Sequence, residues 1–151
     1  MRIPNPLTGV AGQTLVRTGG ATGNVGSFGP TRVDSDGTPK MHKGVDLLAD
    51  VGQPVFAAAD GKVVRAGWED ERNHLIGYGK RVTLEHVGGV ETRYAHLSGI
   101  NVIVGDHVRE GDVVGWAGRT GNVDGDPSIP THLHFELRVA GAPVDPYKAI
   151  A

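Results

Sequence analysis

The sequence predicts a single, mostly β domain built from antiparallel sheet. Glycine supplies 24 of the 151 residues and aromatic residues only 5%, which suits short strands joined by tight turns better than packed helices. Residues 131–139 alternate polar and apolar side chains, as a strand with one buried face does. Two similar strand, turn, strand segments, 53–67 and 104–118, indicate a duplicated hairpin motif.

Composition excludes several classes of partner and site. The formal net charge of -2 gives no electrostatic footprint for nucleic acid, and we expect none to bind. No apolar stretch is long enough to span a membrane, so we expect no membrane insertion. The chain has no cysteine, so any metal site must use His, Asp or Glu. We expect one domain and a monomer.

The chain begins with a stretch rich in proline and glycine. We interpret residues 1–26 as an N-terminal arm, in which Thr14-Leu15-Val16 could pair at a sheet edge. Residues 27–151 form the predicted domain. Its first feature is a polar surface loop at 34–39, which leads the chain to His42.

His42 and Asp46 lie four residues apart around Gly44. On an extended strand their Cα atoms would be about 13 Å apart, too far to share one ion. Glycine permits a bulge or kink that brings both side chains to one point. Taken alone, this pentapeptide fits a surface histidine and an aspartate in a turn better than it fits a metal site.

The middle of the chain predicts three strand pairs. Residues 53–67 fit a hairpin with an Asp60-Gly61 turn, and 104–118 fit its counterpart. Between them, 78–86 and 90–96 form a pair joined by two glycines, with a polar loop at 69–73 before it. By strand alternation Thr92, Tyr94 and His96 should share one face.

The strand at 131–139 gathers the most chemistry. His132, His134, Glu136 and Arg138 share its polar face, and the intervening residues are apolar. The two histidines have Cα atoms about 6.6 Å apart, so both can bind one metal, or one can bind it while the other works beside it. Two solvated surface histidines are the alternative. The remaining histidines, which lack a partner at metal-ligand spacing, are His74, His86 and His107.

Three motifs in order resemble those of one enzyme family. They are His42-Lys43-Gly44-Val45-Asp46, Tyr94-Ala95-His96-Leu97 and His132-Leu133-His134-Phe135-Glu136. Together they closely resemble the signature motifs of the lysostaphin-type (LytM-like) zinc endopeptidases of bacterial peptidoglycan. Gly77-Tyr78-Gly79 and Thr120-Gly121 add to the resemblance, which runs from about residue 27 to residue 146.

The resemblance implies a site and an activity. His42, Asp46 and His134 would bind Zn²⁺, and His96 and His132 would be the catalytic pair beside it, in roles that stay unassigned between them. The implied reaction is hydrolysis of peptide cross-links or bridges of peptidoglycan by a metal-activated water, in an extracellular, periplasmic or cell-wall location. Glu136 would accept a hydrogen bond from a ligand imidazole or form a surface ion pair with Arg138.

Some features leave other functions open. The loop 121–130 is longer than is usual in this family, and both it and the insertion at 68–76 could wall a cleft. A non-catalytic binding module of the same fold, a zinc peptidase with another substrate and a lipoyl-type carrier modified at Lys62 are the alternatives. No residue distinguishes a glycine bridge from a D-Ala-linked cross-link.

Overall fold

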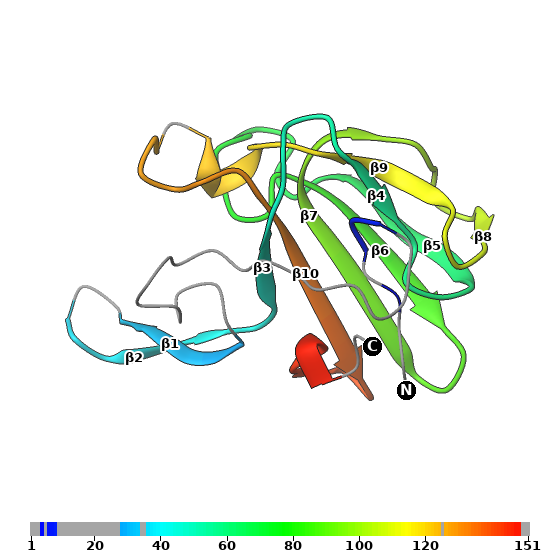
Figure 1. Cartoon of the computed structure of the whole chain (residues 1–151), viewed down its shortest axis with the longest axis horizontal. Coiled ribbons are helices and arrows are strands. Elements are labelled where there is room, and N and C mark those ends of the chain that lie inside the picture. The colour runs from blue at the N-terminus through cyan, green and yellow to red at the C-terminus, as the bar shows by residue number, and fades with distance from the viewer. Residues whose placement is uncertain (1–3, 5, 9–27, 34–35, 125, 149–151) are drawn as a thin grey trace.

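The computed structural model describes residues 4, 6–8, 28–33, 36–124 and 126–148 (Figure 1). In these residues the regular structure is almost entirely strand, as predicted. The strands are β1 (Gly29–Val33), β2 (Pro39–His42), β3 (Val45–Leu48), β4 (Pro54–Phe56), β5 (Gly61–Trp68), β6 (Lys80–His86), β7 (Val90–Ile100), β8 (His107–Val108), β9 (Val113–Ala117), β10 (His132–Val139) and β11 (Ala142–Val144), with 3₁₀ turns η2 (Gly121–Val123) and η3 (Pro146–Lys148). No described helix has the length and apolar character needed to span a bilayer.

One antiparallel sheet carries the domain, and β10 is the second strand from one edge, between β7 on one side and the short strands β3 and β11 on the other. The sheet runs β11-β10-β7-β6-β5-β8, with β3 paired to β10 and β9 paired to both β7 and β4. The strands β1 and β2 form a separate two-stranded ribbon that projects from the sheet (Figure 1). The predicted pairing of 78–86 with 90–96 is confirmed as β6 and β7.

The two predicted hairpins are wrong as local pairs. β4 pairs with β9, and the start of β5 pairs with β8, so each segment pairs with the other one. Gly61 is not in a left-handed conformation; it is needed because a Cβ there would lie 2.5 Å from the carbonyl oxygen of Glu85. The carboxylate of Asp60 accepts a hydrogen bond from the backbone N–H of Glu110. Asp60 and Gly61 therefore make contacts between strands and between the two segments, and do not form a two-residue hairpin turn.

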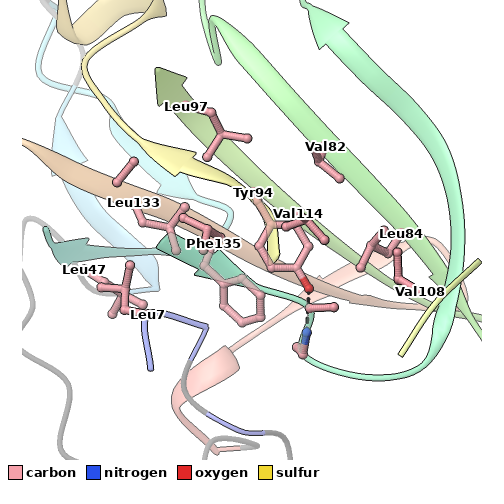
Figure 2. Close-up of a cluster of buried hydrophobic side chains, with 14 of the residues drawn as sticks. Leu7, Leu47, Val82, Leu84, Tyr94, Leu97, Val108, Val114, Leu133 and Phe135 are labelled. Carbon is pink, nitrogen blue, oxygen red and sulfur yellow. Dashed lines mark hydrogen bonds between the residues drawn. The ribbon is translucent and has the colours of Figure 1, made fainter. Parts of the chain in front are cut away.

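The apolar face of β10 packs into the core (Figure 2). Leu133 and Phe135 are fully buried, and the Phe135 ring lies 5.4 Å from the ring of Tyr94 on β7. The Tyr94 hydroxyl accepts a hydrogen bond from the backbone N–H of Ala58. This core fixes the apolar face of β10, and therefore directs the alternate side chains of the strand to the opposite face.

The described part of the N-terminal stretch packs on the domain. Leu7 belongs to the same buried hydrophobic cluster as Leu47 (Figure 2). The carbonyl oxygen of Pro6 accepts a hydrogen bond of 2.8 Å from the backbone N–H of Phe56. The expected edge strand at 14–16 lies outside the described residues.

Candidate active site

The polar face of β10 forms the floor of a groove. His132, His134 and Glu136 point into it and are only 4%, 6% and 0% exposed. The groove has a volume of about 930 Å³ and also reaches His42, Asp46 and His96. The alternative of two solvated surface histidines is therefore wrong. The walls of the groove cover this face, so β10 is buried on both sides.

A bend at Gly44 brings His42 and Asp46 together. β2 ends at His42 and β3 begins after the bend, so the two residues do not lie on one extended strand. Asp46 pairs directly with His134 in the β3–β10 register. A Cβ on Gly44 would lie 2.3 Å from the carbonyl oxygen of Phe135. The predicted kink is present, and its glycine also permits close contact with β10.

Gly44→Ala should disrupt both folding and the site. Because the added methyl group would meet backbone atoms, β3 must move away from β10, at a cost of about 1–3 kcal/mol of folding stability. The control is the exposed neighbour, Lys43→Ala, which should stay within about 0.5 kcal/mol of the wild type. Denaturant unfolding of the two variants measures the difference. Equal stability would show that the close approach at Gly44 is not needed.

Three donor atoms form a small triangle in the groove. His42 Nε2 lies 3.2 Å from Asp46 Oδ1, His134 Nδ1 lies 2.9 Å from the same oxygen, and the two nitrogens are 3.3 Å apart. A tetrahedral zinc ion with bonds near 2.0–2.1 Å separates its ligands by about 3.3 Å. The donor set is also suitable, since two neutral imidazoles and one carboxylate are common zinc ligands.

The second nitrogen of His134 is held by a buried carboxylate. His134 Nε2–H donates to Glu136 Oε2 at 2.8 Å, and the hydroxyl of Tyr78 donates to the same oxygen. Arg138 donates two hydrogen bonds to the other oxygen of Glu136. Both suggested contacts of Glu136 are therefore present, but the ion pair with Arg138 is partly buried and not a surface pair. No role for Tyr78 followed from the sequence analysis; the glycines on either side of it were the only signal.

These hydrogen bonds set the charges around the metal-ligand candidates. Burial raises the pKa of Glu136, but its hydrogen bonds with His134, Tyr78 and Arg138 outweigh burial and lower the pKa to about 2. Burial likewise raises the pKa of Asp46, and hydrogen bonds from His134 and His42 hold it well below its usual value. Both carboxylates are therefore ionised at neutral pH.

His96 reaches the groove through a local change of backbone direction. The predicted alignment of His96 with Thr92 and Tyr94 is wrong, because those two side chains are in the core while His96 lines the groove. The backbone of His96 has a φ of 62°, which interrupts the alternation of β7. The backbone N–H of His96 donates to the carbonyl oxygen of Tyr78 at 2.8 Å, which holds this conformation.

His96 and His132 are anchored in the same way. Nδ1–H of His96 donates to the carbonyl of Thr120, and Nδ1–H of His132 donates to the carbonyl of Pro130, each at 2.8 Å. Because a carbonyl only accepts, each neutral ring carries its proton on Nδ1 and keeps the lone pair on Nε2. Burial, with the nearby His132 and His134, lowers the pKa of His96 to about 3. The ring centroids of His96 and His132 are 5.0 Å apart.

The loop 121–130 forms one wall of the groove, as expected. Asn122, Ile129 and Pro130 line it, and the guanidinium of Arg119 holds the loop through hydrogen bonds to three of its backbone carbonyls. Of the insertion 68–76, only Glu69 is among the described lining residues. The three other histidines lie outside the described lining of the groove; they are His74, stacked on Trp68, the buried His86 and the exposed His107.

Residues 40–146 match the pattern of the family described as Peptidase family M23. The chain belongs to this family. The match covers all five candidate site residues, and the resemblance found from the sequence motifs is confirmed.

The M23 domain has relatives of known sequence and structure. It is 42% identical over 109 residues to the DD-carboxypeptidase/endopeptidase Mpg of Neisseria meningitidis, covering 72% of this chain and 23% of Mpg. The catalytic domain of the antimicrobial peptidase lysostaphin from Staphylococcus simulans superposes with a TM-score of 0.65 at 35% identity, over 81% of this chain and 86% of that one. A zinc-containing peptidase from Vibrio cholerae gives a TM-score of 0.68 at 34% identity, over 80% and 34% of the two chains. The chain thus spans about a quarter of the length of Mpg.

Proposed function

We propose that this chain is a zinc-dependent endopeptidase that hydrolyses peptide cross-links or bridges of bacterial peptidoglycan. The triangle of His42, Asp46 and His134, with two anchored histidines beside it, carries the proposal. The names of the M23 relatives Mpg and lysostaphin support this substrate class. A non-catalytic module would need neither the donor triangle nor the anchored pair. The carrier interpretation of Lys62 loses its basis, because the M23 match includes this residue.

The donor atoms that would hold the ion are Nε2 of His42, an oxygen of Asp46 and Nδ1 of His134. Zinc supplies Lewis acidity at such a site, lowering the pKa of a water toward neutrality. Glu136 orients the His134 ring through its Nε2–H, so that Nδ1 faces the other two donors.

His96 and His132 are placed to move protons. Each ring is held through Nδ1–H and keeps its lone pair on Nε2, and one of these Nε2 atoms accepts a proton from the attacking water. The protonated ring then donates that proton to the amine nitrogen that leaves the substrate. Because the chain contains no His-Glu-x-x-His helix, a histidine takes the part of the glutamate base of other zinc peptidases.

The site residues all come from one chain, so we expect a monomer to be active. The substrate places the protein outside the cytoplasmic membrane, in the cell wall, the periplasm or the medium. Both glycine bridges and D-Ala-linked cross-links remain candidate bonds.

Digestion of purified peptidoglycan tests the function. The zinc-loaded protein should release peptide fragments with new amino and carboxyl termini, identified by mass spectrometry. Exhaustive chelation should abolish the release, and added zinc should restore it. Undiminished cleavage after chelation, or no cleavage by the zinc-loaded protein, would contradict the proposal.

A further inference from the structure

Arginine side chains extend along the groove beyond the donor triangle. Arg81 on β6, Arg93 on β7 and Arg138 on β10 all line it. Arg93 pairs in register with Glu136, whose side chain faces the groove beside His134. The arginines therefore line the same groove that holds the proposed metal ligands.

These three guanidinium groups differ in their partners. Arg138 is bidentate on Glu136, and Arg93 donates from Nε to Glu91 at 2.8 Å. The side chain of Arg81 makes no hydrogen bond or ion pair within the described part of the chain, although the residue is only 6% exposed. Its Nε is buried without any partner. The carboxylate of Glu69, which also lines the groove, accepts the backbone N–H of Tyr78 instead.

An unpaired buried cation is costly, so Arg81 calls for a structural reason. Taking a charge out of water without an opposite charge is strongly unfavourable. Burial, and then the like charges of Arg65 and Arg93, lower the pKa of Arg81, and the carboxylate of Glu69 offsets only part of this effect. An anion in the groove would offset both effects. A planar guanidinium is also well matched to a carboxylate, which it can bind through two parallel hydrogen bonds.

Tyr78 places this cation close to the proposed chemistry. The guanidinium carbon of Arg81 lies 4.9 Å from the centroid of the Tyr78 ring, and that ring lies 5.4 Å from the ring of His134. An extended peptide advances about 3.3 Å per residue. A peptide whose scissile bond lies at the donor triangle can therefore present a group to Arg81 from a residue within about three positions of that bond.

We propose that Arg81, with Arg93 beside it, binds a carboxylate of the peptide substrate. The inference rests on the proposed function, since it assumes that a peptide occupies the groove. The carboxylate has two possible sources: the free C-terminus of a peptide stem, or a side-chain carboxylate next to the scissile bond. Peptide stems that bear a free carboxylate are then the preferred substrates, and neutral bridges are poorer ones.

Synthetic cross-linked peptides test this proposal. One peptide carries both carboxylates, a second has a C-terminal amide, and a third has a side-chain amide. Loss of the recognised carboxylate should lower the kcat/KM of the wild type by about 10- to 100-fold, the range for hydrogen bonds to a charged group. If the C-terminal amide lowers kcat/KM, the recognised group is the free C-terminus; if the side-chain amide lowers it, the recognised group is the side-chain carboxylate. Arg81→Gln should lower kcat/KM on the first peptide by a similar factor and should no longer distinguish that peptide from the amide.

The control is Arg109→Gln, which also removes one positive charge, but at an exposed position outside the described lining of the groove. This variant should keep the wild-type preference for the carboxylate over the amide. Arg81→Lys retains the charge without the planar fork and should recover part of the preference. The comparison of acid and amide in the wild type needs no variant, so a misfolded Arg81→Gln protein does not prevent the test.

Two results would overturn the inference: an unchanged kcat/KM on both amides, or an equal loss by Arg81→Gln on the acid and the amide. If the wild type cuts none of the peptides, the proposed function fails, and calorimetric binding of the uncut peptides decides the inference separately. The inference is supported if the wild type binds one of the amides more weakly than the first peptide, and if this difference disappears in Arg81→Gln. Equal binding of all three peptides would refute it.

Discussion

His132→Ala should lower turnover by about 10²- to 10⁴-fold while the protein still copurifies with about one zinc per chain. The reason is its position beside the donor triangle. His132 Nε2 lies 3.5 Å from Asp46 Oδ1, but the triangle closes without it, and Nδ1 is held by the carbonyl of Pro130. Removing the ring removes a proton carrier and leaves every proposed ligand in place.

Metal analysis and steady-state kinetics on the same preparation measure this result. His96→Ala should behave in the same way, since its ring is anchored equivalently. The matched control is His107→Ala, which removes an exposed histidine outside the described groove lining and should change neither quantity. A His132→Ala protein without zinc would make His132 a ligand, and the catalytic role would then fall to His96 alone.

The sequence predicted the parts of the site that depend on local geometry. Alternation along residues 131–139 placed His132, His134 and Glu136 on one face, since side chains two apart on a strand must share it. The need for a bend at Gly44 followed from the distance between His42 and Asp46 on an extended chain. The pairing of Asp46 with His134 did not follow, because it depends on β3 lying beside β10.

Alternation failed where one residue left the extended conformation. A left-handed backbone at His96 turns its side chain away from the face of Tyr94. Such a conformation is uncommon for any residue other than glycine, so the alternation pattern does not signal it. The predicted hairpins failed for another reason: the strand partners come from the other half of a duplicated segment. Arg81 and Tyr78 were missed as site residues because the order of strands in the sheet, which local patterns do not encode, brings them to the groove.

His134→Ala should abolish zinc binding and activity together. The substitution leaves only His42 and Asp46 of the proposed ligands, which are too few donors to hold the ion against a chelator.

The ring of His134 should also govern how zinc affinity responds to pH. Burial lowers the pKa of His134, but the hydrogen bonds that its ring donates to Asp46 and Glu136 outweigh burial and raise the pKa to about 9 in the metal-free protein. Zinc must then displace a proton below that pH, so its affinity should fall about tenfold per pH unit in acid.

Chelated protein should show the opposite pH dependence of folding stability. The pKa of His134 rises from 6.5 in the unfolded chain to about 9 in the folded one, so its contribution is complete below pH 6.5 and is lost as the pH approaches 9. Metal-free wild type should therefore lose thermal stability between pH 6.5 and 9, while zinc binding strengthens over that range. Metal-free His134→Ala should lack this loss. If both metal-free proteins respond alike to pH, the charged imidazole between the two carboxylates is not what stabilises the metal-free fold.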